Sequence, residues 1–240
     1  MVSAPSFKLG YVPGVTPSKW QRTWSERLPE VPLDLVQALD GQALDLVRDG
    51  SVDAVLMRLP IADRTDLHAI PLYTETTVVV APKEHWIAAA EEVTVAELAD
   101  EVVLHPLDDV LDWSGPPGRP AGERPGSTTH ALGMVAAETG VVLLPQSVAR
   151  LHHRKDLIYR PVTDATQSSV ALVWPSVQET SELMEQLIGI VRGRTVNSSR
   201  GRVETPAPAK TPAPAKRPAT PRKPGQARQR TPRRGKPRGR

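Results

Sequence analysis

Residues 43–57 read ALDLVRDGSVDAVLM, and this stretch gives the strongest single indication of the fold. Its first half places Leu44 and Val47 on one face of a short helix, and Gly50 is a typical helix stop. Its second half, residues 53–57, is an apolar run of the length expected for a buried strand. A short helix that passes directly into a buried strand is typical of a parallel sheet covered by helices.

The residues before this stretch also predict strands and helices that follow one another along the chain. An apolar-polar strand at residues 7–12 stops at the turn Pro13-Gly14. Thr16 is predicted to cap the helix that follows, and a second strand at residues 33–39 leads to Asp40, the predicted cap of the next helix. Three strands with helical connections of a few residues predict a parallel α/β sheet.

The residues after Met57 continue with strands and helices in a less regular order. The pattern predicts, in turn, strands at 67–72 and 76–81, a helix opened by the capping box Thr94–Glu97, a strand at 102–105, a long loop at 106–126, a helix at 127–138, a strand at 141–144, a helix from Gln146, strands at 157–162 and 170–174, and a last helix opened by a capping box at 176–179.

Composition excludes several classes of protein. The chain has 240 residues, of which 39% are hydrophobic, so it can build a substantial core. It contains no cysteine, which excludes a disulfide framework, a thiol nucleophile and a zinc site with cysteine ligands. No signal peptide or long apolar span is recognisable, so we expect a cytoplasmic protein that makes no membrane contact.

The charge is distributed unevenly along the chain. Residues 200–240 carry 14 Lys or Arg side chains and one acid, Glu204, whereas residues 1–199 carry 16 basic and 26 acidic side chains. The last segment also holds nine of the 25 prolines and includes the repeat TPAPAK at 205–210 and 211–216. Such a segment has too little apolar surface to offset the entropy of folding, and we predict that it is disordered.

This basic tail resembles the tails of histone H1 and of some actinobacterial nucleoid proteins. Proline spacing holds the chain extended, so that its cations project along it and contact DNA or RNA without sequence preference. The alternative is a solubilising extension. The cations predicted to contact nucleic acid are Lys210, Lys216, Arg217, Arg222, Lys223, Arg228, Arg230, Arg233, Arg234, Lys236, Arg238 and Arg240.

Several motifs together resemble the effector-binding domain of LysR-type transcriptional regulators. They are the strand KLGY at 8–11 with Pro13, the run LDLVRDGSVDA at 44–54, PLYTE at 71–75, VVVAP at 78–82 with His85, residues 94–101, and MVAAETGVVLLP at 134–145. The resemblance covers roughly residues 6–196. No single motif is specific, but the motifs stand in the order and at about the spacing of that family.

The resemblance implies the two-lobed α/β fold of type 2 periplasmic binding proteins, with two crossover strands between the lobes. Domain 1–199 would then consist of lobe one, about 6–79 and 168–196, and lobe two, about 80–167, followed by the tail at 200–240. The family has a winged helix-turn-helix ahead of this domain, and we expect this chain to lack it. The loop at 106–126 departs from the family, which has a helix and a strand there.

In such a fold, ligands bind where strands end and helices begin, because free backbone amides and the helix dipole favour an anion there. The candidate ligand-binding residues lie at three such openings and at one strand end: Pro13, Gly14 and Thr16; Asp40 and Gly41; Ser127 and Thr128; and Arg58. Arg58 matches a position where the family frequently has an arginine that faces the cleft. The alternative is that the polar residues are ordinary helix caps and that Arg58 is a solvated strand-end side chain. His105, Asp108 and Gln146 are weaker candidates.

No motif for catalysis, for a cofactor or for a metal is present, so we expect neither an enzyme nor a bound cofactor. The first functional hypothesis is a sensor of a small, anionic molecule in transcriptional regulation, with a homodimer or a partner regulator as further partners. The second hypothesis is a scaffold that binds no ligand and whose active part is the basic tail.

Overall fold

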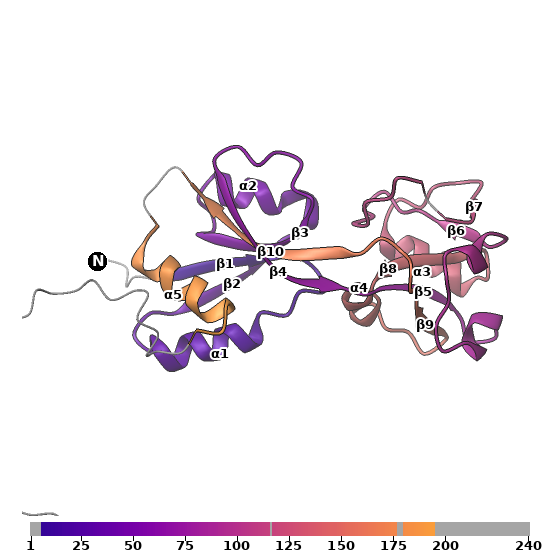
Figure 1. Cartoon of the computed structure of the whole chain (residues 1–240), viewed down its shortest axis with the longest axis horizontal. Helices are drawn as coiled ribbons and strands as arrows, with labels where there is room; N and C mark the ends of the chain where they lie inside the picture. Colours follow the sequence, from indigo (N-terminus) through magenta and orange to yellow (C-terminus); the bar gives the residue numbers. More distant parts are fainter. Residues whose placement is uncertain (1–5, 116, 177–179, 195–240) are drawn as a thin grey trace, which may run out of the picture. The chain divides into compact units, whose positions relative to one another are not determined.

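The computed structural model describes residues 6–115, 117–176 and 180–194, except for the side chain of Asp40. These residues form two lobes, each built on a five-stranded sheet (Figure 1). The α/β fold class predicted from the sequence is confirmed. The tail at 200–240, with all its predicted nucleic-acid contacts, lies outside the described residues.

The first lobe contains β1 (Phe7–Tyr11), α1 (Ser18–Arg27), β2 (Leu33–Gln37), the 3-10 helix η1 (Asp40–Gln42), α2 (Ala43–Arg48), β3 (Ala54–Leu59), β4 (Leu67–Glu75), β10 (Ser168–Pro175) and α5 (Glu182–Val191). The second lobe contains β5 (Thr77–Pro82), the 3-10 helices η2 (Trp86–Ala89) and η3 (Ala96–Leu98), β6 (Val102–Leu104), β7 (Arg119–Pro120), α3 (Thr128–Ala136), β8 (Val141–Pro145), α4 (Gln146–Leu151) and β9 (Leu157–Pro161).

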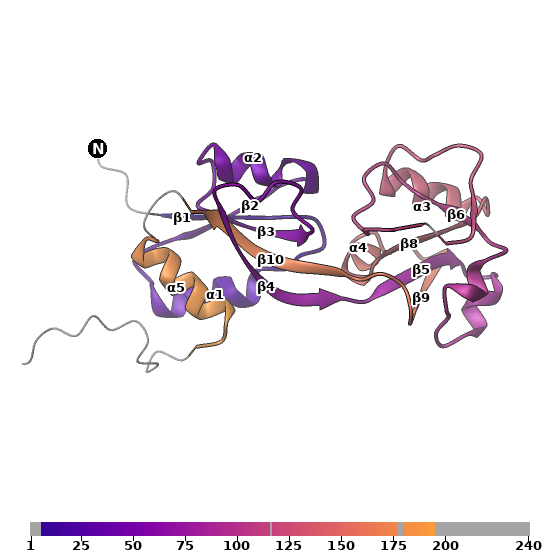
Figure 2. The same cartoon turned by 45° about the horizontal axis from the view of Figure 1, so that its top comes forward.

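The first sheet has the strand order β2-β1-β3-β10-β4. As predicted, β1 is parallel to β2 and β3, whereas β10 is antiparallel to both of its neighbours. Helices α1 and α5 lie on one face and α2 on the other (Figure 2). Trp24 of α1 is fully buried, and the centroid of its ring lies 5.2 Å from that of Phe7. Its Nε1 donates a hydrogen bond to the Val31 carbonyl.

The second sheet has the order β7-β6-β8-β5-β9 and is also mixed. Successive residues of β5 pack into two different cores, one on each face of the sheet. Val78 and Val80 pack with α3 and α4, whereas Val79 and Ala81 pack with Ile87 and the other side chains on the opposite face. Burial on both faces explains why β5 and β8 are continuously apolar rather than alternating.

The chain crosses between the sheets twice. A single residue, Thr76, separates β4 of the first sheet from β5 of the second, and the chain returns to the first sheet in β10, which begins at Ser168. The whole of β5 therefore belongs to the second sheet, although the sequence analysis placed residues 77–79 in the first lobe.

Three predicted helix starts are wrong. Pro17, not Thr16, occupies the N-cap position of α1, because the Pro17 carbonyl accepts the first helical hydrogen bonds. Leu39 occupies the N-cap position of η1, because its carbonyl accepts hydrogen bonds from the amides of Gln42 and Ala43, so Asp40 is the first residue of η1 and not its cap position. The last helix begins at Glu182 with Ser181 as its cap, and most of the capping box expected at 176–179 lies outside the described residues.

Two predicted caps are confirmed. Glu97 accepts hydrogen bonds from the backbone and the hydroxyl of Thr94, and Ser127 Oγ accepts from the His130 amide at the start of α3. The longest described helices, α1 and α5, have 10 residues each. Within residues 6–115, 117–176 and 180–194, no helix is long and apolar enough to cross a membrane.

Candidate functional site

A cavity of about 780 Å³ is lined by residues of both lobes, and we call it the cleft cavity. The first lobe contributes the ends of β1 and β2 together with η1, and the second contributes α3, α4 and the loop after β6. The lining residues are Pro13, Gln37, Leu39, Gly41, Gln42, Leu107, Asp108, Asp109, Val110, Thr128, Thr129, Leu144, Val148, Leu151 and His152.

Two smaller cavities share lining residues with the cleft cavity. One of about 420 Å³ shares Gly41 and Asp109 with it and includes Arg58. The other, of about 380 Å³, shares Gln37 and Leu151 and includes Arg150. Residues far apart in the sequence therefore line three adjoining cavities.

The candidate residues from the sequence are distributed over this region. Pro13, Gly41 and Thr128 line the cleft cavity, Gly14 and Thr16 line the cavity of about 380 Å³, and Arg58 and Gly41 line the cavity of about 420 Å³. Ser127 lines none of these three cavities and serves as the cap of α3. The side chain of Asp40 lies outside the described part of the structure.

Gly14 brings the turn after β1 close to the second lobe. Its φ is +85°, in the left-handed region that favours glycine. A Cβ atom here would lie 2.8 Å from Ser147 Oγ and 3.1 Å from an Arg58 guanidinium nitrogen. This close approach requires glycine for reasons of space as well as conformation, and it places the turn directly against α4.

Arg58 and Glu75 form a buried ion pair where the first crossover leaves β4. Arg58 Nε lies 2.8 Å from Glu75 Oε2, and the two side chains are 3% and 4% exposed. Ser147 and Ser168 donate hydrogen bonds to the same carboxylate, and Arg58 Nη2 donates to Ser147 Oγ at 3.1 Å. Arg58 is thus part of a network that joins β3, both crossover strands and α4, and not the solvated strand-end side chain of the alternative interpretation.

A carboxylate of the protein occupies the N-terminus of α3. Asp108 Oδ1 accepts hydrogen bonds from the Thr128 amide at 2.6 Å and from Thr128 Oγ1 at 2.9 Å. Since the first amides of a helix favour a negative charge, this contact stabilises the helix and attaches the loop to it. The anion position that the sequence analysis assigned to a ligand is here filled by the protein itself.

The loop at 106–126 is held by further polar contacts. Asp109 accepts hydrogen bonds from the Leu111 amide and from Trp113 Nε1, and its Oδ2 lies 3.8 Å from His105 Nδ1. Burial raises the pKa of Asp109, and the Leu111 amide and the His105 charge act against this. Burial lowers the pKa of His105, and the nearby Asp109 charge acts in the opposite direction.

We expect His105 to make the fold sensitive to mild acid. Because its pKa in the folded state lies below the ordinary value, the unfolded state binds the proton first, and stability falls as the pH decreases through that range. The raised pKa of Asp109 has the opposite sign and stabilises the folded state towards lower pH. The variant His105→Gln should therefore lose less stability than the original chain between about pH 7.5 and about pH 5.5.

Urea unfolding at both pH values measures this difference. His153→Gln, at an exposed position, is the matched control and should keep the original pH dependence. Parallel pH profiles of the His105→Gln variant and the original chain would contradict the assignment.

Sequence reasoning missed the apolar rim of the cleft cavity and the partners of Arg58. Leu39, Leu107 and Leu151 are between half and two thirds exposed, and each lines the cavity. A large apolar residue in a turn or at a helix end is a sign of an exposed apolar surface, and this sign could have identified all three leucines. Glu75 and Ser147 gave no signal, because nothing local in the sequence relates them to Arg58.

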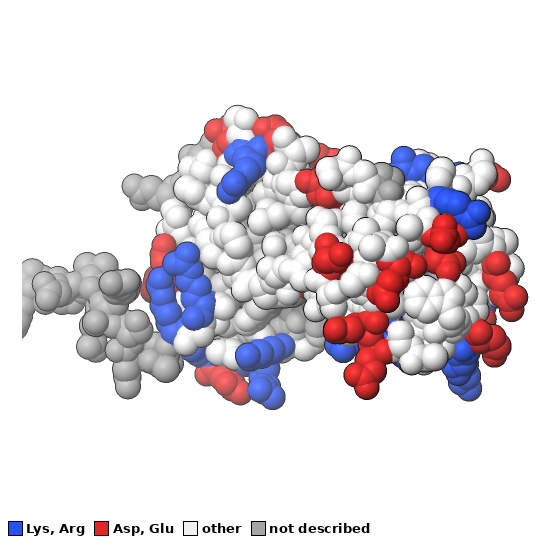
Figure 3. All heavy atoms as spheres, turned by 45° about the vertical axis from the view of Figure 1, so that its right-hand side comes forward, with Lys and Arg blue, Asp and Glu red and all other residues white. Residues whose placement is uncertain are grey.

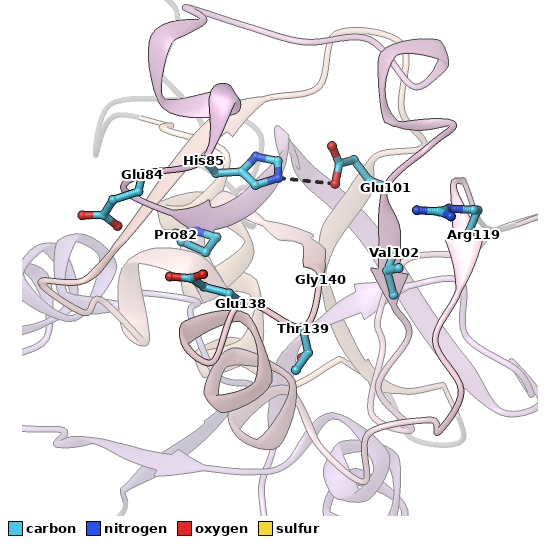
Figure 4. A pocket seen from close by; sticks show the side chains of 9 residues that line it. All are labelled: Pro82, Glu84, His85, Glu101, Val102, Arg119, Glu138, Thr139 and Gly140. Atoms are coloured by element: carbon cyan, nitrogen blue, oxygen red, sulfur yellow. Dashed lines mark ion pairs between the residues drawn. The ribbon is translucent and has the colours of Figure 1, made fainter.

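A separate cavity of about 310 Å³ lies within the second lobe (Figure 4). His85 and Glu101 point toward one another there, with His85 Nε2 3.3 Å from Glu101 Oε2, and Trp86 Nε1 donates to the other carboxylate oxygen at 2.6 Å. Glu84, Glu138 and Arg119 also line it. Its polar contacts connect η2 to the start of β6 and are sufficiently explained by that structural role.

Comparison with known proteins identifies relatives of the whole described region. The sequence model of the family described as LysR substrate binding domain matches residues 6–195. A probable hydrogen peroxide-inducible genes activator of Mycobacterium avium is 27% identical over 205 residues, which cover 80% of this chain and 65% of the relative. The Hca operon transcriptional activator HcaR of Escherichia coli (strain K12) is 26% identical over 201 residues, covering 79% and 65%. The chain thus spans slightly less than two thirds of either relative.

Solved structures show the same fold. The oxidized form of OxyR superposes with a TM-score of 0.64 at 23% identity, covering 80% of this chain and 96% of that one. The BenM effector binding domain with its effector benzoate superposes with a TM-score of 0.60 at 21% identity, covering 79% and 91%.

Proposed function

The chain belongs to the LysR substrate binding domain family, and on this basis we propose that it senses a small molecule in the cleft cavity as part of transcriptional regulation. The resemblance inferred from the sequence motifs is confirmed. The relatives described above are regulators of transcription rather than enzymes.

The cleft cavity is the observation that carries this proposal. Its volume of about 780 Å³ falls within the range typical of small-molecule sites. Residues of both lobes line it, and the lobes are joined by only two crossovers. A bound molecule that contacts both sides would favour one arrangement of the lobes over others, which is the physical basis of a ligand-controlled switch.

A thiol-based response is not available to these 240 residues. Relatives of this chain are named as hydrogen peroxide-inducible activators, but the chain has no cysteine that could be oxidised. This supports reversible binding of a molecule as the sensing event. We further propose that the protein has no catalytic activity, needs no cofactor and acts in the cytoplasm, where a regulator of transcription meets DNA.

The basic tail is proposed to contact DNA or RNA without sequence preference. Residues 200–240 carry 14 of the 30 Lys and Arg side chains. Acidic side chains gather over the second lobe on the face shown in Figure 3, and that face is unsuited to a polyanion. A second copy of the chain, or a regulator with its own DNA-binding domain, is the further partner that the family suggests.

Thermal unfolding of the full chain against a panel of small metabolites tests the sensor proposal. A ligand present at about 100 times its dissociation constant should stabilise the fold by about 2.7 kcal/mol, which corresponds to a rise in Tm of about 5–10 °C. Thr129→Trp, an exposed substitution at the cavity wall, should abolish the rise without changing the Tm of the free protein. If no compound stabilises the chain while the tail still binds nucleic acid, the scaffold hypothesis replaces the sensor.

A further inference from the structure

We infer that the cleft cavity selects a ligand that has an apolar body and no negative charge, and that Asp108 favours a ligand with an amine group. This inference rests on the proposed sensor function and names the ligand class of the same site. The sequence analysis expected an anionic ligand, and this inference replaces that expectation.

The rim of the cavity supplies the apolar contact. Leu39, Leu107 and Leu151 are 61%, 65% and 53% exposed, which makes them the three most exposed of the large apolar side chains among the described residues. All three line this one cavity: Leu39 immediately precedes η1, Leu107 lies in the loop after β6, and Leu151 is the last residue of α4. Apolar side chains gathered around a concave site are typical of a surface that a ligand covers.

Two of the four positions that were expected to bind an anion, Arg58 and the start of α3, already hold carboxylates of the protein. Arg58 is buried against Glu75, with 2.8 Å between Arg58 Nε and Glu75 Oε2. The first amide of α3 donates to Asp108 Oδ1 at 2.6 Å. A carboxylate guest would have to displace one of these charge-assisted hydrogen bonds, which are stronger than neutral ones.

The charges of the cavity wall oppose an anion as well. Among the described residues that line the cleft cavity there is no Lys or Arg, whereas Asp108 and Asp109 both belong to the lining. Asp108 is exposed, and within the described ranges its second carboxylate oxygen accepts no hydrogen bond. An ammonium group has the donors and the charge to bind that oxygen.

The adjoining cavity at Thr16 offers a carboxylate an exposed cation. Arg150 lines it, is exposed, and donates to Tyr159 Oη at 3.3 Å. The test must therefore separate binding in the cleft cavity from binding beside Arg150.

Three probes with one apolar body and different charge provide the test: 3-phenylpropylamine, 3-phenylpropanamide and 3-phenylpropanoate. Isothermal titration of the full chain at neutral pH should show the amine and the amide binding at least about tenfold more tightly than the carboxylate. Asp108→Asn, which keeps an oxygen to accept from the Thr128 amide, should reduce the affinity for the amine to that for the amide. Asp100→Asn, an exposed carboxylate elsewhere on the second lobe, should change nothing.

Three results would overturn the inference. Carboxylate binding that equals or exceeds amine binding, and that persists in Arg150→Gln, would show that the charge preference of the cleft cavity is wrong. Amine binding that persists unchanged in Thr129→Trp would place the amine outside the cleft cavity. If none of the three probes binds, the inference fails, and stabilisation by the metabolite panel then decides separately whether the sensor function stands.

Discussion

Arg58→Met should lower the free energy of unfolding by about 3–5 kcal/mol, because it leaves the Glu75 carboxylate buried without this cation. A loss of this size is a large share of the stability of an ordinary domain. Two serine hydroxyls remain as donors to Glu75, but they carry no charge to balance it. The sequence analysis took Arg58 as a ligand-binding candidate, with a solvated side chain at the strand end as the alternative, and it did not predict the partner Glu75.

A double-mutant cycle separates the ion pair from the packing of the side chains. Glu75→Gln alone should also destabilise the fold, whereas the Arg58→Met/Glu75→Gln combination should lose less than the sum of the two by about 2 kcal/mol. Urea unfolding of all four proteins provides the free energies. Asp63→Asn, which breaks the exposed ion pair between Arg48 and Asp63, is the control and should have little effect. Additive losses would refute a coupled pair.

The position of this pair explains why its loss would affect the sensor as well as the stability. Glu75 ends β4 and Ser168 begins β10, so both crossover strands meet at one carboxylate, and Ser147 adds the first turn of α4. Any change in the angle between the lobes must be accommodated near these residues. The network therefore connects the fold of each lobe to the geometry of the cavity between them.

Local signals in the sequence were sufficient for the first three strands. The apolar run of β3 directly follows a helix with an inward face, and short connections leave a parallel arrangement as the simple solution. The place of β10 between β3 and β4 had no local signal, because β10 begins 93 residues after the end of β4 and pairs antiparallel with both strands. Helix starts were wrong by one residue at Pro17 and Leu39, within the usual uncertainty of helix ends.

Most of the candidate residues named from the sequence line the adjoining cavities, but nothing local in the sequence indicated the charged partners of these residues. Residues of all three predicted strand-to-helix openings line adjoining cavities. The first two openings follow neighbouring strands of the first sheet, whereas the third belongs to the second lobe. The partners of the polar groups are separated by long stretches of chain: Glu75 by 17 residues and Ser147 by 89 from Arg58, and Asp108 by 20 from Thr128. No residue pattern encodes such pairs, so only the structure shows that Arg58 and the start of α3 already hold carboxylates of the protein.

Deleting residues 200–240 should abolish retardation of random-sequence duplex DNA in a gel-shift assay, and this is the largest effect we expect. The deletion removes a segment with a net charge of +13 and leaves residues 1–199 with a net charge of −10, which repel a polyanion. Binding of the full chain should weaken by a factor of about 10³–10⁵ between about 50 and about 200 mM salt if six to ten cations contact phosphates.

Partial removal of charge makes this prediction quantitative. Changing four tail cations, Arg222, Lys223, Arg228 and Arg230, to alanine should reduce the slope of log affinity against log salt by about 3.6 if all four contact phosphates. The matched control changes four exposed cations of the described domain, Lys19, Arg22, Arg64 and Lys83, and should leave the slope unchanged. Retardation that survives deletion of the tail would instead locate the nucleic-acid contact on the acidic domain. Because the slope depends on the number of phosphates neutralised, its change in the four-residue variant measures how many of these four cations contact phosphates.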